Sequence, residues 1–412
     1  MKLLIGVAAA GALAWMTSGQ DPVPLKLPSG FTATVVNEGV GKARHIVVDA
    51  SGTIFVKLSK LEKGKGLAIL RDTDKDGKAE TVSYATGYAG TGIAIWKDWL
   101  YDSSDSSVYR YPLKNGAIDE SKRETIVTGL TFQREHGSKS ITLDDAGHLY
   151  VNFGAPSNAC QERNRQLGSK GMEPCPILEW YGGIWQFDGA KKNQKQADGV
   201  RFATGIRNAV ALDWNPASKQ LYALQHGRDD LHRLYPSLYT DEQNAELPGE
   251  EFLLVKKGSD FGWPYCYYDW QTSKKVLAPE YGGDGGRKVG ICEGKDLPLL
   301  SFPGHWAPND LLFYTGNQFP ARYKNGAFIC FHGSWNRSPL QQRGYLVAFI
   351  PMGKDGKPSG KYEIFADNFA GGEIMSPGDA QARPVGLAQG ADGALYISDS
   401  INGKIWKITS RK

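Results

Sequence analysis

Residues 140–154 read SITLDDAGHLYVNFG, and this stretch decides the fold because its pattern returns along the chain. An apolar run is followed by an acidic turn with glycine and by a second run of apolar and aromatic residues, which predicts a β-hairpin. Clear copies begin at His45 (HIVVDASGTIFVKL), Ala209 (AVALDWNPASKQLYALQHG) and Pro384 (PVGLAQGADGALYISD). Weaker copies begin at Gly92 (GIAIWKDWLYDSS) and Phe319 (FPARYKNGAFICFHGS).

The spacing of the six turns predicts a radial repeat. The turns fall at Gly52, Lys97, Gly147, Ser218, Asn325 and Gly393. The first two intervals, 97 − 52 = 45 and 147 − 97 = 50, match one propeller blade of ~40–45 residues, and the longer ones indicate a blade plus an inserted loop. We therefore expect an all-β fold, a six-bladed β-propeller with long inserted loops in the middle and fifth blades. A pair of β-sandwiches is the alternative, and helical periodicity is confined to a short helix near Asp241 to Glu246.

The composition of the 412 residues excludes several function classes. The chain has 50 Gly, 21 Pro, 11 Trp, 19 Tyr and 16 Phe, which is typical of many short strands joined by tight turns. Its 48 basic and 44 acidic residues give a net charge of +4, so no nucleic-acid partner is expected. The sequence has no G-x-S-x-G elbow, phosphate-binding loop or dinucleotide fingerprint.

The first 19 residues have the pattern of a signal peptide. Met1-Lys2 precedes an apolar run from Leu3 to Met16, and Thr17, Ser18 and Gly19 follow as small residues. The run is too short to span a bilayer core of ~30 Å as a helix. We expect an exported protein, periplasmic or secreted, whose single propeller domain covers residues 20–412 and which is not an integral membrane protein after processing; an uncleaved membrane anchor is the alternative.

The five cysteines are consistent with an oxidising compartment. Cys160 and Cys175 bracket one polar loop and Cys266 and Cys292 bracket a second, so the pairs Cys160–Cys175 and Cys266–Cys292 would each close an insertion. Four cysteines allow three connectivities, which leaves this pairing open at the sequence level. Cys330 lies in an apolar run and is expected to be a buried free thiol.

Four clusters of polar residues stand at strand ends, where propellers place functional loops. His136 precedes a blade strand and could act as a general base or as a hydrogen-bonded loop residue. Arg207 and Asn208 precede the next blade and would suit a carboxylated or carbonyl-bearing ligand, or an interblade salt bridge. Gly227 and Arg228 could offer main-chain carbonyls to calcium, with Asp230 nearby, or could cap the strand. The last cluster is the loop of His332, Ser334, Trp335, Asn336 and Arg337, which presents a stacking face surrounded by donors.

Arginines occupy equivalent positions in several blades. Arg44 opens the first blade and Arg383 opens the last, as Arg207 opens its own. Propeller symmetry brings equivalent positions together around the axis, so these cations should converge on the channel mouth. Such a cluster requires an anion, either a polyanionic small ligand or a cofactor.

Asp72, Asp74, Asp76 and Gly77 copy the start of an EF-hand loop, and Glu80 follows. The twelfth position is Ser83, so the bidentate glutamate is missing. A calcium-stiffened hairpin and a simple acidic turn both fit this segment.

At these clusters the sequence resembles the pyrroloquinoline quinone (PQQ)-dependent sugar dehydrogenases, and it is most similar to the sorbosone or pyranose dehydrogenase branch related to soluble glucose dehydrogenase. The strings that carry the resemblance lie between residues 40 and 410 and include HGSKSITLDDAGHLYVNFG, ATGIRNAVALDWNP, LQHGRDDL and RPVGLAQGADGALYISD. The family fold is a six-bladed propeller. The resemblance implies that PQQ, a tricarboxylated ortho-quinone, binds at the channel mouth.

The resemblance also implies the role of each site residue. His136 would take the proton from the sugar C1 hydroxyl, while Arg207 would polarise the quinone carbonyl to which hydride passes. Asn208 would hold the cofactor edge, and carbonyls of Gly227 and Arg228 would hold Ca²⁺. The carboxylates of the cofactor would meet Arg383 and the HGSWNR loop. The substrate would be a sugar or sugar aldehyde, with electrons leaving to an external acceptor, a cytochrome or a quinone.

The chain also departs from the family. Soluble glucose dehydrogenase has a lysine where this chain reads HGSWNR, so His332 and Arg337 would replace that contact. Two other functions stay open: a propeller that binds carbohydrate or protein without catalysis, and a calcium-dependent hydrolase of the lactonase type. A propeller that only binds a ligand does not need a base that faces an Arg-Asn pair. A lactonase-type hydrolase would require several Asn, Asp and Glu side chains that face the channel.

Overall fold

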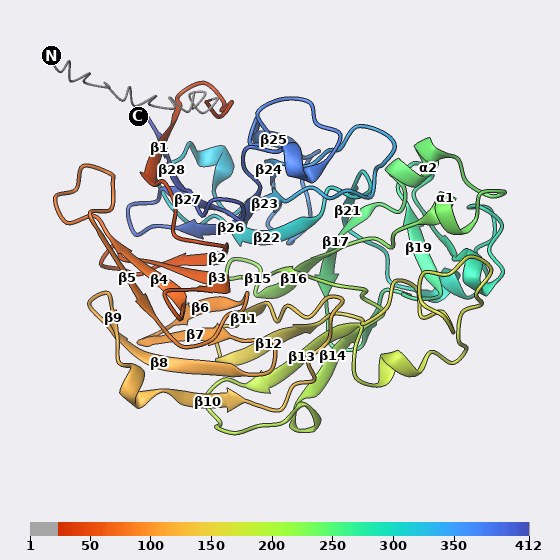
Figure 1. Cartoon of the computed structure of the whole chain (residues 1–412), viewed down its shortest axis with the longest axis horizontal. Helices are drawn as coiled ribbons and strands as arrows, with labels where there is room; N and C mark the ends of the chain where they lie inside the picture. The colour runs from red at the N-terminus through yellow and green to blue at the C-terminus, as the bar shows by residue number, and fades with distance from the viewer. Residues whose placement is uncertain (1–23, 412) are drawn as a thin grey trace, which may run out of the picture.

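The computed structural model describes residues 24–411, which form six sheets, each built on four antiparallel strands, around a common axis (Figure 1). The predicted signal peptide, residues 1–19, lies outside the described residues. In the first three blades the strands, from the axis outward, are β2 (Ala43–Val48), β3 (Ile54–Glu62), β4 (Lys65–Arg71) and β5 (Thr81–Ala85); β6 (Ile93–Trp96), β7 (Trp99–Ser103), β8 (Val108–Lys114) and β10 (Glu124–Val127); and β11 (Ile141–Leu143), β12 (His148–Phe153), β13 (Gly183–Asp188) and β14 (Val200–Thr204).

The last three blades follow the same plan, except that the chain's first strand completes the sixth. Their strands are β15 (Ala211–Asn215), β16 (Gln220–Gln225), β17 (Glu250–Val255) and β21 (Leu300–Phe302); β22 (Pro308–Phe313), β23 (Ala327–Phe331), β24 (Leu346–Ile350) and β25 (Glu363–Ala366); and β26 (Pro384–Gln389), β27 (Leu395–Asp399), β28 (Ile405–Ser410) and β1 (Phe31–Asn37). Short additions are β9 (Ala117–Ile118), which pairs with β8, and β18 (Ser259–Asp260), which pairs in parallel with β14.

The blades close into a ring. The inner strands of consecutive blades contact one another in the order β2, β6, β11, β15, β22, β26 and back to β2, and Figure 1 shows these strands gathered at the centre of the molecule. The hydrophobic core is correspondingly divided into layers, and a cluster of buried apolar side chains lies between each pair of adjacent blades. The predicted six-bladed propeller is confirmed.

The acidic turns of the repeat have a direct physical role. Asp144 accepts hydrogen bonds from the main-chain N–H groups of Ala146 (3.0 Å) and His148 (2.9 Å) through one carboxylate oxygen, and Gly147 takes a left-handed φ of 91°. An aspartate that caps its own turn and a glycine that tolerates positive φ together reverse the chain in the space available. Asp49 caps the first turn in the same way, through Ser51 and Thr53. Five of the six predicted hairpins form as expected. The copy predicted from Phe319 is wrong in its first half: the residues before Asn325 include the 3₁₀ turn Ala321–Tyr323, and β23 pairs with β22 further upstream.

Strand β1 closes the ring, a feature that the repeat pattern did not predict. It pairs with β28 from Phe31 opposite Ser410 to Asn37 opposite Ile405, so the start of the propeller supplies the outer strand of its last blade. Phe31 packs edge-to-face on Phe319 and Phe365 of blade five, with ring centroids 4.8 and 5.0 Å apart. The pairing therefore joins blade six both to the chain's beginning and to its neighbour.

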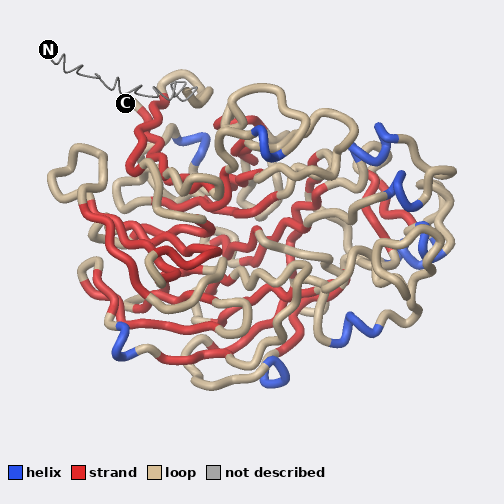
Figure 2. Tube along the Cα trace, in the orientation of Figure 1, coloured by secondary structure: helices blue, strands red, loops and turns tan. Residues whose placement is uncertain are grey.

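The insertions lie mainly in blades three and four. A loop separates β12 from β13 and contains the disulfide Cys160–Cys175. Blade four carries α1 (Leu231–Leu234), α2 (Asp241–Glu246) and a two-stranded sheet of β19 (Cys266–Asp269) and β20 (Lys274–Leu277), where Cys266 pairs with Cys292. The predicted disulfides, the short helix and the buried free thiol of Cys330 are confirmed; α1 was not predicted. Figure 2 shows the helical turns at the edge of the molecule, outside the blades.

In blade five, where the spacing also predicted an insertion, shorter loops follow all four strands, at residues 314–326, 332–345, 351–362 and 367–383. The 3₁₀ turns of the described chain are Glu120–Lys122, Pro176–Glu179, Gln196–Asp198, Pro279–Tyr281, Gly290–Gly294, Ala321–Tyr323 and Pro377–Asp379. Within the described residues, no helix has the length and apolar character that a membrane span needs.

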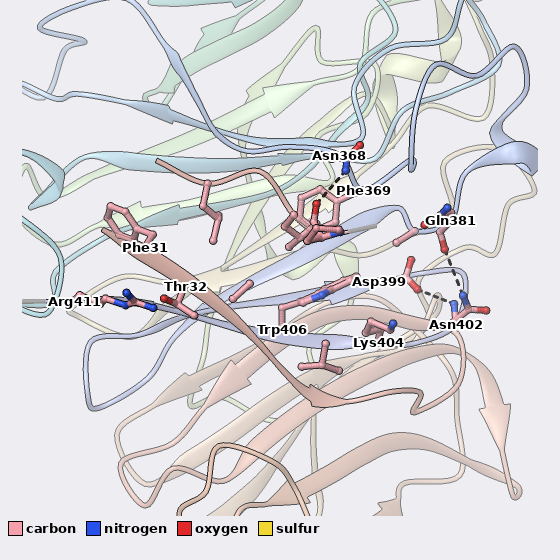
Figure 3. A pocket seen from close by; sticks show the side chains of 16 residues that line it. Phe31, Thr32, Asn368, Phe369, Gln381, Asp399, Asn402, Lys404, Trp406 and Arg411 are labelled. Atoms are coloured by element: carbon pink, nitrogen blue, oxygen red, sulfur yellow. Dashed lines mark hydrogen bonds between the residues drawn. The ribbon is translucent and has the colours of Figure 1, made fainter. Parts of the chain in front are cut away.

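A groove of about 900 Å³ runs beside β1 at the outer seam of blade six. Figure 3 shows Phe31, Phe369 and Trp406 along it, with Gln381 and Asn402 hydrogen-bonded at one side. None of the predicted site residues lines this groove. The groove and the predicted site are therefore separate features of the molecule.

We expect Phe31→Ala to lower the free energy of unfolding by about 2–4 kcal/mol, because it removes the ring that fastens β1 to blade five. Phe132→Ala is the matched control, since Phe132 is 68% exposed, and it should cost less than about 0.5 kcal/mol. Chemical denaturation followed by tryptophan fluorescence measures both. Equal stability of the two variants would contradict the role assigned to β1.

Candidate active site at the channel mouth

The amino-terminal ends of the inner strands meet at one mouth of the channel. Arg44 of β2 donates to the hydroxyls of Thr91 (3.2 Å) and Ser138 (3.4 Å), which precede β6 and β11. His226, after β16, has its Nε2 2.8 Å from the carbonyl oxygen of Pro308 in β22. These contacts bring loops from consecutive blades together around one opening.

Below the mouth, the channel holds a cavity of about 290 Å³ lined by all six inner strands. Its walls are mostly aliphatic, with Asp213 and Asp310 as the carboxylates. Each carboxylate accepts a main-chain N–H from the next blade, Asp213 from Phe313 (3.1 Å) and Asp310 from Leu387 (2.8 Å). Burial raises the pKa of Asp213 to about 7. The carboxylates of Asp213 and Asp310 therefore link neighbouring blades, and the predicted ligand site lies closer to the mouth of the channel.

His136 is held in one orientation. Its φ of 54° is left-handed, and its Nδ1 lies 2.6 Å from the carbonyl oxygen of Ala155. Because a carbonyl can only accept, Nδ1 carries the proton and Nε2 keeps its lone pair. Gly154 is required here, since a Cβ would lie 2.5 Å from the Cβ of His136 and 2.7 Å from Oδ1 of Asn208. Gly154 is therefore in close contact with both His136 and Asn208, and a larger residue at this position would clash with both side chains.

The electrostatic environment keeps His136 neutral. Burial, followed by the charge of Arg207, lowers the pKa of His136 to about 3. Burial likewise lowers the pKa of His226 to about 4. The imidazole of His136 can therefore accept a proton at neutral pH, which a general base must do.

Arg207 is almost completely buried and its guanidinium is fixed by three partners. Its Nη2 donates to Asp229 Oδ2 (2.6 Å) and Asn158 Oδ1 (3.0 Å), Nε to the carbonyl of Asn158 (3.2 Å), and Nη1 to the carbonyl of Gly227 (2.8 Å). One of the five N–H groups, on Nη1, has no partner in the described chain. Beside it, Asn208 accepts from Nδ2 of Asn152 through Oδ1 (3.0 Å), which turns its own amide nitrogen away from that contact.

Arg44 and Arg383 stand at the mouth without a carboxylate partner within salt-bridge distance in the described chain. Arg383 donates to the carbonyls of His332 (3.1 Å) and Gly333 (2.6 Å), and its Nη2 lies 2.8 Å from Nδ1 of His332. Arg44 donates to hydroxyls, as described above. Desolvation is the largest effect that lowers the pKa of each arginine. Asp105 lies near enough to Arg44, and Asp399 near enough to Arg383, to raise the arginine pKa, but neither forms a direct ion pair in the described chain. Partly buried cations without a direct carboxylate partner are consistent with an anion site.

Residues of the loop that contains HGSWNR have two different roles: some lie at the channel mouth, and Arg337 anchors the loop to α2. His332 is beside Arg383, and Trp335 is 60% exposed. Ser334 donates to the carbonyl of His305 (3.0 Å), and Asn336 donates to Asp229 Oδ1 (2.6 Å). Arg337 is buried and donates to the carbonyls of Ala245 (2.5 Å) and Gly304 (3.2 Å) and to the carboxylate of Glu246 (2.6 Å). The structure thus gives Arg337 contacts that anchor the loop to α2, in place of the cofactor contact that the sequence suggested.

The segment Gly227 to Asp230 differs from the predicted ligand set in one respect. The Asp230 carboxylate makes ion pairs with Arg165 (2.9 Å) and Arg233 (2.8 Å), so its oxygens are engaged elsewhere. The carbonyl of Gly227 accepts from Arg207, whereas that of Arg228 accepts no hydrogen bond from a described residue. Of the two predicted carbonyls, that of Arg228 is therefore the one without a hydrogen-bond donor among the described residues.

Several residues of this site were missed by sequence reasoning. Asp229 accepts from Arg207 and Asn336, and nothing local distinguishes it from Asp230. Glu250 accepts from the N–H groups of Gly227 (3.0 Å) and Ala307 (3.1 Å), and burial raises its pKa to about 8. Because β17 reads as an ordinary strand, the sequence carries no signal for this support.

The Asp72 loop is far from the mouth, in the turn between β4 and β5. Asp72, Asp74, Asp76 and Glu80 place one carboxylate oxygen each within 4.8 Å of one another. Glu80 also accepts from the N–H (2.6 Å) and hydroxyl (2.7 Å) of Thr73. Calcium binding by this loop stays a prediction.

We expect the ring resonance of His136 to stay unchanged when the cofactor-free protein is titrated from pH 8 to pH 5, since its pKa is near 3. An unfolded histidine binds its proton near pH 6.5, so this buried neutral ring costs the fold stability as the pH falls below 6.5. NMR of ring-labelled histidine measures the titration, and His136→Gln assigns the signal. A midpoint between 6 and 7 would show that the ring is not shielded as described.

This chain is similar to known proteins in both sequence and structure. The TrAA12-like family matches residues 25–411. A pyrroloquinoline quinone-dependent sugar dehydrogenase of Hypocrea jecorina is 25% identical over 93% of this chain and 89% of that protein. A pyrroloquinoline quinone-dependent pyranose dehydrogenase of Coprinopsis cinerea is 24% identical over 94% of this chain, which spans 55% of that longer protein.

A solved calcium structure of the Trichoderma reesei carbohydrate-active enzyme family AA12 superposes with a TM-score of 0.77 and 20% identity, over 96% of this chain and 99% of that one. This likeness supports the propeller fold. The sorbosone part of the sequence-based resemblance finds no counterpart among these proteins. From the match over nearly all of its described residues, the chain belongs to the TrAA12-like family.

Proposed function

We propose that this protein is a PQQ- and calcium-dependent dehydrogenase that oxidises a sugar or sugar aldehyde. The observation that carries the proposal is the pair of partly buried arginines, Arg44 and Arg383, at the same opening as the neutral His136. Among residues 24–411, neither arginine has a carboxylate partner within salt-bridge distance. A tricarboxylated quinone would supply the missing negative charge. The relatives named above support the choice of PQQ over another polyanion.

The residues at the mouth fit such a ligand. Arg44 and Arg383 would hold carboxylates, and Asn208 would hold the ring edge. His332 accepts from Arg383 through Nδ1 and has its Nε2 2.7 Å from the Ser400 hydroxyl, so it would orient Arg383 instead of holding a carboxylate itself. The free Nη1–H of Arg207 would reach a quinone oxygen. Ser334, Trp335 and Asn336 would form the adjoining wall, where the exposed Trp335 ring offers a stacking face. Arg337 is left out of this set because its donors hold α2.

Calcium would be held by the main-chain carbonyls of Gly227 and Arg228 together with an oxygen of the cofactor. The carboxylates of Asp229 and Asp230 already serve arginines, so they contribute charge without direct coordination. The calcium structure of the related Trichoderma reesei protein supports the choice of calcium as the ion.

The chain's residues would act on the substrate in a defined order. The Nε2 lone pair of His136 would accept the proton of the C1 hydroxyl, while Nδ1–H keeps its bond to Ala155. Bound PQQ supplies the quinone that accepts hydride from C1. Arg207 would stabilise the negative charge that develops opposite, in a site from which burial excludes much of the water. Electrons would then pass to an external cytochrome or quinone.

A lactonase-type hydrolase is less well supported by the channel. Its carboxylates in the cavity, Asp213 and Asp310, accept main-chain N–H groups of neighbouring blades.

The two disulfides support export to an oxidising compartment, as does the signal-like start of the sequence.

We expect His136→Gln to lower kcat for sugar oxidation by about 10²–10⁴-fold, because glutamine cannot take the proton. His148→Gln is the control, since that ring is half exposed at the opposite end of β12. Dye reduction by PQQ- and calcium-loaded protein over a panel of sugars gives the rates. Turnover by the wild type that survives His136→Gln would refute the assignment of the base.

We expect Arg383→Gln to weaken PQQ binding at least tenfold, which corresponds to the loss of about 1.4 kcal/mol or more from one charged hydrogen-bonding partner. Arg322→Gln is the matched control, because Arg322 pairs with Glu363 on the surface. Quenching of protein fluorescence by PQQ, with and without Ca²⁺, gives the dissociation constants. Identical affinities of the two variants would remove Arg383 from the site.

A further inference from the structure

Arg165 links three segments of the candidate site. Its Nη2 lies 3.3 Å from Glu135 Oε2 and 2.9 Å from Asp229 Oδ2, and its Nη1 lies 2.9 Å from Asp230 Oδ2. Glu135 directly precedes His136. The side chain is only 26% exposed, so these ion pairs are partly shielded from solvent.

The loop that carries Arg165 is itself fixed. It is closed by the disulfide between Cys160 and Cys175, 15 residues apart. Arg165 has a left-handed φ of 57°, and its N–H donates to Oε1 of the buried Gln161 (2.9 Å). A non-glycine residue keeps such a conformation only where its surroundings impose it. The neighbouring Asn164 also donates to Glu135 Oε1 (2.9 Å).

Through Asp229, the contact extends to the buried arginine. One oxygen of Asp229 is shared by Arg165 (2.9 Å) and Arg207 (2.6 Å), and the other accepts from Asn336 (2.6 Å). Arg165 partly neutralises the carboxylate of Asp229. Asp229 therefore compensates the positive charge of Arg207 less completely, and part of that charge can attract an anionic ligand. Without Arg165, the Asp229 carboxylate would keep Arg207 as its one ion-pair partner within 3 Å, with Asn336 on its other oxygen, and Glu135 would keep only the amide of Asn164.

We propose that Arg165, presented by the loop between Cys160 and Cys175, is a positioning residue that fixes the His136 loop and the Arg207–Asp229 pair relative to each other. Its role in turnover rests on the proposed dehydrogenase function, whereas its role in holding the loops does not. Arg165 would touch neither sugar nor cofactor. The disulfide would matter to activity because it fixes the loop that carries this side chain.

The first test uses cofactor-free protein, so it is independent of the proposed function. Hydrogen–deuterium exchange is compared for wild type, Arg165→Ala and Arg163→Ala, an exposed neighbour on the same loop. Arg165→Ala should speed exchange at least tenfold in peptides covering 133–138 and 226–230, and Arg163→Ala should leave both unchanged. Unchanged exchange in Arg165→Ala would overturn the proposal.

The second test separates positioning from mere stability in the PQQ- and calcium-loaded protein. Arg165→Ala should lower kcat at least tenfold, with the KM for the sugar changed less than threefold, and Arg165→Lys should recover part of kcat. Should Arg165→Ala fail to fold, Glu135→Gln removes only the arm that reaches the His136 loop, and it should lower kcat at a nearly unchanged melting temperature. Wild-type kcat in folded Arg165→Ala or in Glu135→Gln would refute this role. A wild type without turnover would refute the dehydrogenase proposal and leave the exchange result standing.

Discussion

Closure of the ring by β1 and β28 is the constraint on which the rest of the structure depends. Each blade buries its apolar faces only against the next, so six layers of core exist only if the first and last blades meet. The β1–β28 pairing joins residues near the two ends of the chain, and the aromatic contacts of Phe31 extend it to blade five. With the ring closed, the inner strands start at one mouth and their loops converge there.

Burial at that mouth determines the chemistry that is available. Desolvation keeps His136 and His226 neutral. Arg44 and Arg383 are partly buried at the same mouth, and neither has a carboxylate partner within salt-bridge distance among the residues that the structure describes. The positive charge of Arg207 is balanced by Asp229, which Arg165 shares. The site therefore combines an unprotonated base with cations that can receive an anion. That combination suits proton removal from an alcohol beside a negatively charged acceptor.

Much of this could be predicted from sequence because the repeat is local. A hairpin turn is encoded within a few residues, as Asp144 and Gly147 show, so five of the six hairpins were found. The sixth was misplaced because the partner of β23 lies upstream of the predicted segment. The disulfides followed from the loops that they close. Features that depend on distant contacts were not visible. The sequence of β1 gives no sign of its partner β28, which lies 405 − 37 = 368 or more positions away. Arg337 reads like its neighbours although Ala245 and Glu246 hold it. Asp229 and Asp230 are adjacent acids that only the fold assigns to different arginines.

The most direct test of the central claim is a crystal structure of the protein with PQQ and Ca²⁺. The arrangement described here predicts one PQQ at the channel mouth, with carboxylates at Arg44 and Arg383, a quinone oxygen near Arg207, and the calcium on the carbonyls of Gly227 and Arg228. It also predicts that Nε2 of His136 faces the space left for the sugar. PQQ bound elsewhere, or a mouth that stays without it at saturating concentration, would contradict the assignment of this opening as a quinone site.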